Sequence, residues 1–282
     1  MTTLPDGAGP VVDKQVRLEG ILRSLGRVAV AYSGGVDSTY LLAAAVDALG
    51  SHNVLALTVA SELMPGREVA LAEEMAACLG VDHQVLAFQA LEVPGIAANP
   101  PDRCYLCKRE MLQRIAVAAS AQGFPHLVHG ANRDDLDDFR PGARAAAELG
   151  VRAPLEEAGL TKAEIRDLSH CRDLPTWDRP SQACLASRVP YHTPLTVEAL
   201  RRIQAAEGYL HDRLGVRALR VRDHFPVARI ELPPGDWPAL LAEDARPALL
   251  AEFRRLGYRY VALDLAGLQS GSLNDLLVGS TT

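Results

Sequence analysis

Apolar runs and amphipathic segments alternate along the first two thirds of the chain. Short runs rich in Val, Leu and Ala predict buried strands at 28–31, 54–59, 84–88 and 127–130. Apolar residues at helical spacing follow the first three runs and predict helices at 39–49, 67–79 and 108–121. This alternation predicts parallel strands joined by helical crossovers, hence an α/β fold with a doubly wound parallel sheet.

The pattern changes after Pro190. A capping box of Thr161 and Glu164 predicts one more helix of the first part, at 161–171. Beyond it, the sequence predicts a helix at 196–214, strands at 218–222 and 228–232, a helix at 237–256 and a strand at 258–263. We therefore expect two domains, a large one over 1–189 and a smaller α/β domain over 190–282.

Composition limits the classes of protein that this chain can represent. Of its 282 residues 48% are hydrophobic, yet no run is long enough to span a membrane, and residues 1–10 lack the pattern of a signal peptide. A cytoplasmic protein that does not act at membranes is therefore expected, with its five cysteines reduced or bound to metal. The formal net charge of −6 argues against a dedicated nucleic-acid binder.

The most informative motif is Ser-Gly-Gly-Val-Asp-Ser at 33–38, between the first strand and its helix. Glycines at such a turn let backbone N–H groups approach a phosphate closely. The residues expected to cradle pyrophosphate are Ser33, Gly34, Gly35 and Ser38. No Walker-type lysine is present, and the Asp37 carboxylate suits a Mg²⁺ ion that bridges to phosphate. The motif resembles the signature of ATP pyrophosphatases; an ordinary glycine-rich turn is the alternative.

Three cysteines form the second candidate site. Cys104 and Cys107 make a Cys-x-x-Cys at a predicted helix start, where the helix dipole and basic neighbours favour thiolates, and Cys184 lies in a loop-like segment. A redox pair, a zinc half-site and plain helix-start cysteines are all compatible with the pair alone. Alternatively, all three cysteines bind an iron–sulfur cluster that keeps one iron open. Cys78 and Cys171 are expected to be small buried residues of helices.

Taken in order, the motifs resemble the LarE family of ATP-dependent sulfur transferases over nearly the whole chain. The motifs are Ser-Gly-Gly-Val-Asp-Ser at 33–38, Arg-Cys-Tyr-Leu-Cys-Lys at 103–108, His-Gly-Ala-Asn-Arg-Asp-Asp at 129–135, Arg-Pro-Gly at 140–142, Cys-Leu-Ala-Ser-Arg-Val-Pro-Tyr at 184–191 and Leu-Arg-Val-Arg at 219–222. Their order is more restrictive than any one of them.

The resemblance implies a reaction. In that family ATP adenylates a carboxylate of pyridinium-3,5-biscarboxylic acid mononucleotide, and sulfur displaces AMP to give a thiocarboxylate for the nickel-pincer nucleotide cofactor. Some members of the family sacrifice their own cysteine as the sulfur source. For members with three cysteines, the resemblance implies a sulfide bound to a [4Fe–4S] cluster instead. The resemblance thus implies ATP, Mg²⁺ and a [4Fe–4S] cluster as cofactors, a small-molecule nucleotide substrate, a sulfide donor and a homo-oligomer. It gives the smaller domain a role in substrate binding or oligomerisation.

The resemblance also assigns residues. The nucleotide-binding set is Ser33, Gly34, Gly35, Asp37, Ser38, Gly130, Asp135 and Arg140. Asp37 and Cys184 are the catalytic residues, and the metal ligands are Cys104, Cys107 and Cys184. The substrate-side set is Ser187, Arg188, Glu207, Arg220 and Arg222. Spacing supports the last pair independently, because residues two apart on a strand share a face and their guanidinium groups can bind one phosphate. A solvated strand face is the plainer interpretation.

Two other functions share the loop at 33–38. The tRNA thiolases couple adenylation of a base to sulfur insertion, but the acidic balance and the lack of a basic, aromatic-rich face weigh against them. A nucleotide-binding sensor of the same fold would bind ATP without releasing pyrophosphate. Product analysis separates this sensor from an enzyme.

Overall fold

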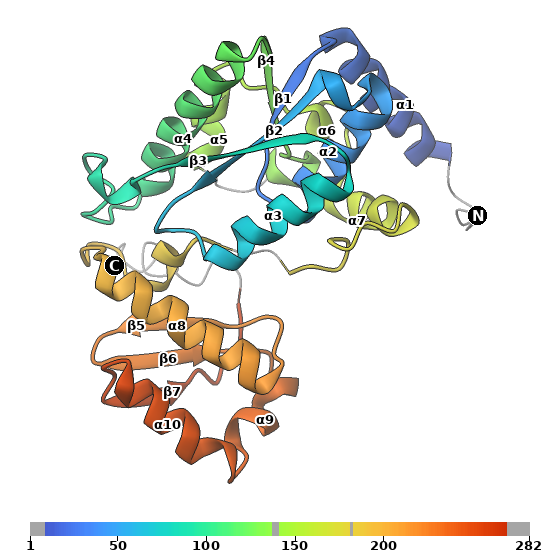
Figure 1. Ribbon diagram of the computed structural model, residues 1–282. Coiled ribbons are helices and arrows are strands. Elements are labelled where there is room, and N and C mark those ends of the chain that lie inside the picture. Colours follow the sequence, from blue (N-terminus) through green and yellow to red (C-terminus); the bar gives the residue numbers. More distant parts are fainter. Residues whose placement is uncertain (1–8, 137–140, 181–182, 270–282) are drawn as a thin grey trace, which may run out of the picture. The chain divides into compact units, whose positions relative to one another are not determined.

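The computed structural model describes residues 9–136, 141–180 and 183–269, and the chain divides into two compact units (Figure 1). Unit 1 consists of residues 1–89 and 102–181, and unit 2 of residues 90–101 and 182–282. In the described part of the chain, no helix combines the length and the apolar character needed to cross a membrane.

Unit 1 is built on a four-stranded sheet in which every strand is parallel to its neighbours. The strands are β1 (Val28–Ala31), β2 (Val54–Ala60), β3 (Asp82–Ala87) and β4 (His126–His129), in the order β3-β2-β1-β4. Val28 lies between Val54 of β2 and His126 of β4 in the register. The predicted doubly wound parallel sheet is confirmed, and all four expected strands are present within about two residues of their predicted bounds.

Helices complete the α/β layers of unit 1. They are α1 (Gly9–Leu25), α2 (Val36–Leu49), α3 (Gly66–Cys78), α4 (Arg103–Ala121), α5 (Pro141–Glu148), α6 (Pro154–Glu157) and α7 (Lys162–Cys171), with 3₁₀ turns η1 (Ser51–Asn53) and η3 (Arg133–Leu136). The chain winds outward through α2 and α3 and then returns through α4 to β4, beside β1. Because such crossovers are right-handed, α4 covers the face opposite α2 and α3, and Figure 1 shows α4 together with α5.

The core of unit 1 lies around α2. Tyr40, Leu41, Leu42 and Ala45 are almost completely buried, between the sheet and the helices α1 and α7. The alanines of α2 leave little side-chain volume, which allows neighbouring helices to pack close to it. The start of α2 is therefore held firmly, and α2 is the helix that follows the predicted phosphate loop.

Unit 2 is a three-stranded mixed sheet with helices. It contains η2 (Ala90–Glu92), η4 (Leu185–Arg188), α8 (Val197–Leu214), β5 (Arg220–His224), β6 (Val227–Glu231), η5 (Pro234–Asp236), α9 (Trp237–Leu241), α10 (Ala245–Arg255) and β7 (Tyr260–Leu263). The strand order is β5-β6-β7, with β5 and β6 antiparallel and β6 and β7 parallel. Phe253, Val221 and Ile230 belong to its own apolar core.

The boundary between the units differs from the predicted one at 189/190. It falls at 181/182, and the segment 90–101 belongs to unit 2. The fully buried Asn99 explains this, because its side-chain amide donates to the carbonyls of Pro190 (2.8 Å) and Thr193 (3.1 Å), and its own carbonyl accepts from the His192 amide. These hydrogen bonds join distant parts of the sequence and leave no local pattern.

Three helical features also differ from expectation. The predicted helix at 237–256 is divided into α9 and α10, because Pro247 lacks an N–H donor and its ring would clash with the Glu243 carbonyl of a continuous helix. The helices α1 and α5 were not predicted. Apolar residues do recur at helical spacing in α1, at Val11, Leu18, Leu22 and Leu25, so its signal was present in the sequence. The helix α5 has only eight residues, and alanine supplies its apolar positions.

The ends of β1 and β4 form the point at which the winding direction reverses, where doubly wound sheets bind ligands. Gly130, directly after β4, lies against the first turn of α2. A Cβ atom there would be 2.9 Å from the Ser38 amide nitrogen and 3.0 Å from the Ser38 Cα. Only glycine fits this approach without displacement of backbone.

We predict that Gly130→Ala lowers the free energy of unfolding of unit 1 by about 1–3 kcal/mol, because its methyl group meets backbone rather than a flexible side chain. Gly20→Ala in α1 is the matched control: its Cβ meets no atom within 4 Å, and it should stabilise the helix by about 0.5–1 kcal/mol. Urea unfolding of both variants measures this. Equal stability of Gly130→Ala and the unsubstituted protein would contradict the packing described.

Candidate functional site

The loop at 33–38 connects β1 to α2 and has the geometry of an anion site. Gly34 has a φ of +71°, and a Cβ atom there would be 3.1 Å from the Ala72 Cβ of α3, so glycine is required for two reasons. Ser38 Oγ lies 3.0 Å from Ser33 Oγ and donates to the Gly35 carbonyl at 3.1 Å. These contacts fold the loop tightly around the start of α2.

The first turn of α2 presents backbone donors. Its N-cap residue, Gly35, makes no side-chain capping hydrogen bond. Amide groups of an uncapped first turn, together with the positive end of the helix dipole, favour a bound phosphate. The expected roles of Ser33, Gly34, Gly35 and Ser38 as a pyrophosphate cradle are compatible with this geometry.

Asp37 is the acidic member of the loop and has two partners within unit 1. One carboxylate oxygen is paired with the ammonium group of Lys162, at the start of α7, and the other lies 3.5 Å from the Asn132 side-chain amide. Neither partner was assigned from the sequence, because they lie 125 and 95 residues away along the chain. The Asp37 carboxylate is partly exposed, which suits exchange of partners.

The turn after β4 forms the opposite wall of this site. Asp135 Oδ2 accepts from the Asn132 amide at 3.1 Å, and Asn132 Oδ1 accepts from the Asp134 amide at 3.0 Å. Asp134 Oδ2 in turn accepts from the Lys162 amide at 2.9 Å. Asp135 therefore shapes the turn that carries Asn132. Arg140, expected to stabilise phosphate, lies outside the described residues.

A second cation lies at the other end of the loop, and it too was not assigned from the sequence. Arg179 Nη1 donates to the Gly34 carbonyl at 3.2 Å, while Nη2 donates to both carboxylate oxygens of Glu68, at 3.0 and 3.1 Å. Arg166 of α7 holds this segment through the carbonyls of Trp177 and Arg179, both at 2.7 Å. Arg179 thus fixes the Gly34 peptide, and the buried Glu68 fixes Arg179.

Burial controls protonation at the end of β4. Burial, with the nearby Lys108 ammonium, lowers the pKa of His129 to about 4, so this imidazole is neutral at pH 7. Burial also lowers the pKa of Lys108, which lies on α4. The carboxyl end of β4 therefore offers a neutral imidazole rather than a second positive charge.

The cysteines are all thiols rather than disulfides. Cys104 and Cys107 lie in the first two turns of α4, three positions apart and hence on one side of the helix, whereas Cys184 lies in unit 2 just before η4. Within the described ranges, no group of three or more His, Cys, Asp or Glu is arranged to hold a metal. Cys78 and Cys171 are exposed, so the expectation that both are buried was wrong; each occupies the outer side of its helix near its end.

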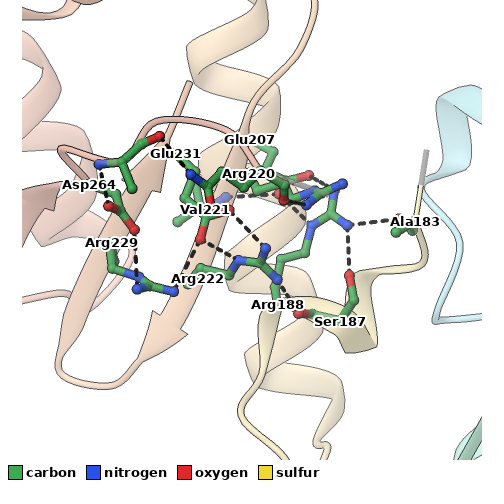
Figure 2. A network of polar contacts seen from close by, with 12 residues as sticks. Ala183, Ser187, Arg188, Glu207, Arg220, Val221, Arg222, Arg229, Glu231 and Asp264 are labelled. Carbon is green, nitrogen blue, oxygen red and sulfur yellow. Dashed lines mark hydrogen bonds and ion pairs between the residues drawn. The ribbon is translucent and has the colours of Figure 1, made fainter. Parts of the chain in front are cut away.

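Two buried ion pairs dominate the polar network of unit 2 (Figure 2). Arg188 of η4 donates to both carboxylate oxygens of Glu207 on α8, at 2.8 and 3.2 Å. Arg222 of β5 donates to both oxygens of Glu231 on β6, each at 2.8 Å. All four residues are 3% exposed or less. Paired guanidinium and carboxylate groups satisfy one another here, as burial of charge requires.

This network holds the segment that carries Cys184. Arg188 Nη1 donates to the Ala183 carbonyl at 2.8 Å and to Ser187 Oγ at 2.9 Å. Ser187 Oγ donates to the Cys184 carbonyl at 2.8 Å, and Arg222 Nη1 donates to the Ser187 carbonyl at 2.6 Å. The expected substrate-side residues Ser187, Arg188, Glu207 and Arg222 are therefore brought together, but through contacts with one another.

Arg220 is less buried than Arg222, which lies on the same face of β5. It is half-buried rather than fully buried, and Figure 2 shows it beside the two ion pairs, while its Nη1 donates to the Gln269 carbonyl at 2.7 Å. Burial and the nearby charges of Arg222 and Arg188 lower the pKa of Arg220. Arg229 also pairs with Glu231, at 3.1 Å, and with Asp264, at 3.2 Å. Four arginines thus face three carboxylates in this network, which leaves one positive charge in excess.

We predict that substitution of the two arginines of β5 has very different effects on the stability of unit 2. Arg222→Ala leaves the Glu231 carboxylate buried with less charge compensation and should lower the free energy of unfolding of unit 2 by about 3–5 kcal/mol. Arg220→Ala removes a repelled charge and should change it by less than about 1 kcal/mol. In a Trp177→Phe background, the fluorescence of Trp237 reports on unit 2 during urea unfolding. Equal losses would contradict the distinction.

Comparisons with known proteins identify the family of this chain. The asparagine synthase family model matches residues 18–118. An uncharacterized protein of Synechocystis sp. is 41% identical over 94% of this chain and 98% of its own length. The pyridinium-3,5-bisthiocarboxylic acid mononucleotide synthase of Lactiplantibacillus plantarum is 38% identical over 94% of this chain and 95% of its own length. The argininosuccinate synthase of Halobacterium salinarum is 33% identical over 53% of this chain and 40% of its own length. The chain therefore belongs to the LarE family of ATP-dependent sulfur transferases, within the PP-loop ATP pyrophosphatase superfamily.

Proposed function

We propose that this enzyme uses ATP to adenylate a carboxylate of pyridinium-3,5-biscarboxylic acid mononucleotide and then replaces AMP with sulfur, in synthesis of the nickel-pincer cofactor. The observation that carries the proposal is the phosphate loop at 33–38 in a chain that matches the Lactiplantibacillus plantarum synthase over 94% of its length. A full-length match of this kind supports the sulfur transferase over a tRNA thiolase or a non-catalytic sensor, which the loop alone also allows.

The first step activates a poor acyl donor. A carboxylate oxygen of the substrate attacks the α-phosphorus of ATP, the bond between the α-phosphorus and the bridging oxygen breaks, and pyrophosphate leaves with that oxygen. The backbone N–H groups at the start of α2 stabilise the charge that develops on pyrophosphate, and the tight folding of the loop by Ser33 and Ser38 fixes their directions in advance.

The Asp37 side chain fits a Mg²⁺ ion that accompanies the nucleotide. Its carboxylate is partly exposed at the end of the loop, and the side-chain NH2 group of Asn132 lies 3.5 Å from one of its oxygens. Mg²⁺ prefers carboxylate oxygens together with substrate phosphates, and when bound it would neutralise phosphate charge. Asp37 would hold the ion.

The second step forms the carbon–sulfur bond. A sulfide attacks the carbonyl carbon of the acyl-adenylate, the bond from that carbon to the AMP oxygen breaks, and AMP leaves with one of the original carboxylate oxygens. No redox change is needed. The segment held by Arg188 and Arg222 carries Cys184, and we assign these arginines, with Glu207 and Ser187, to positioning that cysteine.

Arg220 supplies the positive charge for the substrate. It carries the excess charge of the network in unit 2 and is only half-buried, so an anionic group of the substrate can reach it. A phosphate accepts bidentate hydrogen bonds from a guanidinium group. We therefore assign the phosphate of the pyridinium nucleotide to Arg220, and substrate binding and self-association to unit 2.

The sulfur source completes the proposal. Cys104 and Cys107 share one side of α4, and their residue type fits an iron–sulfur cluster, with Cys184 as third ligand from unit 2. Such a [4Fe–4S] cluster, when bound, would supply the sulfide and leave Cys184 intact. Arg103, whose Nη2 lies 3.9 Å from Cys104 Sγ, adds positive charge that favours the thiolate form.

The expected products test the adenylation. With the carboxylated pyridinium nucleotide present, ATP should yield AMP and pyrophosphate, and Asp37→Ala should lower that rate at least about a hundredfold, as the loss of a group that holds charge in the transition state. Asp47→Ala is the matched control, since Asp47 is an exposed carboxylate of the same helix. Chromatography of the labelled nucleotides separates the products, and release of ADP and phosphate would contradict the assignment.

Iron analysis and mass spectrometry test the sulfur source. Anaerobically reconstituted protein should contain iron and acid-labile sulfide. Cys104→Ser, Cys107→Ser and Cys184→Ser should each abolish both, whereas Cys78→Ser and Cys171→Ser should not. The mass of the Cys184 peptide should be unchanged after several turnovers. Loss of the elements of H₂S from Cys184 would show a sacrificial cysteine and overturn the cluster proposal.

A further inference from the structure

The phosphate loop has no positively charged side chain of its own to balance the charge of a bound triphosphate. The segment 33–38 contains one ionisable side chain, the carboxylate of Asp37. The triphosphate of ATP carries about four negative charges, and like charges within a few ångströms repel strongly. Cations from other parts of unit 1 are therefore needed at the loop.

Among the residues that the structure describes, Arg179 and Lys162 contact the loop, and they differ in how firmly their side chains are held. Arg179 is held at both ends of its guanidinium group by the Gly34 carbonyl and by Glu68, whose side chain is 10% exposed. Lys162 has the Asp37 carboxylate as its ion-pair partner and its side chain is 31% exposed. A partly exposed ion pair contributes less stability than a buried one, so exchange of this partner costs little.

The main chain of Lys162 is held by several contacts, whereas its ammonium group has the Asp37 carboxylate as its partner. Its amide donates to Asp134 at 2.9 Å. The preceding residue, Thr161, forms a capping box with Glu164, and Glu164 is paired with Lys14 of α1 at 2.7 Å. The flexible four-carbon stem of Lys162 therefore starts from a fixed point beside the loop.

The position of Lys162 along its helix is an independent sign of function. It is the first residue of α7, where the helix dipole is positive and a cation is disfavoured. An acidic residue is preferred at such a position. A lysine that opposes the dipole and points to the loop carboxylate is explained by the need for a positive charge at that place.

Building on the proposed ATP site, we propose that Lys162 exchanges partners during binding. Without nucleotide, its ammonium group neutralises Asp37 and competes with metal for that carboxylate. When ATP and Mg²⁺ enter, Asp37 turns to the ion and Lys162 turns to the phosphates that become pyrophosphate. Lys162 thus becomes a pyrophosphate ligand only when nucleotide is bound. It takes the role of the lysine that a Walker loop carries within its own sequence.

The proposal predicts effects of opposite sign from a single substitution. Lys162→Gln should bind Mn²⁺ at least about tenfold more tightly in nucleotide-free protein, because Asp37 loses its competing cation, and should bind pyrophosphate at least about tenfold more weakly. Lys162→Arg keeps the charge and should largely restore both affinities. Electron paramagnetic resonance measures free Mn²⁺, and calorimetry measures pyrophosphate binding.

Arg172→Gln is the matched control, because it also removes a cation paired with a carboxylate of α2, Asp47, but at the opposite end of α7 from the loop. It should change neither affinity. Weakened or unchanged Mn²⁺ binding by Lys162→Gln would overturn the exchange, as would unchanged pyrophosphate binding. Neither readout uses the pyridinium substrate or sulfur, so failure of the exchange is distinct from failure of the ATP site, in which the unsubstituted protein would not bind pyrophosphate.

Discussion

The contact of Gly130 with the first turn of α2 brings two halves of the proposed nucleotide site together. Because no Cβ intervenes, the chain after β4 lies within van der Waals distance of the Ser38 backbone. The turn carrying Asn132, Asp134 and Asp135 then faces Asp37. The Lys162 amide bonds to this turn, so α7 is connected to the same point. Sheet topology places the strand ends side by side, and glycine allows their final approach.

Both units hold cations with carboxylates, but burial gives these ion pairs different roles. Arg188 and Arg222 lie in the interior of unit 2, where separation from their carboxylates would leave unpaired buried charge at a cost of about 3–5 kcal/mol. They therefore fix structure, in this case the segment of Cys184. Lys162 is partly exposed, where an ion pair contributes about 0–1 kcal/mol, and it can change partners. The degree of burial, not the residue type, distinguishes positioning from ligand binding.

The sequence alone predicted the parallel sheet, the tight turn between β1 and α2 and the family, because these depend on local periodicity and contiguous motifs. It did not predict Lys162, Arg179 or Asn132 as partners of the loop, since these lie 95 to 145 residues from it. It grouped Arg220 with Arg222 by strand alternation, which identifies a shared face but not the depth of burial. Opposing charges on separate elements, α8 and β6, determine that depth. Whether Cys104, Cys107 and Cys184 share a cluster stays a prediction.

The most direct measurement is a crystal structure of the enzyme with Mg²⁺ and α,β-methylene-ATP, which resists cleavage at the bond that the reaction breaks. The account predicts the β- and γ-phosphates within hydrogen-bond distance, about 2.7–3.2 Å, of backbone N–H groups in the segment 33–38. It also predicts that the Asp37 carboxylate binds the Mg²⁺ ion that accompanies these phosphates. Phosphates bound away from this segment, with the Gly34–Gly35 peptide facing solvent, would contradict the assignment of the loop and with it the proposed first step.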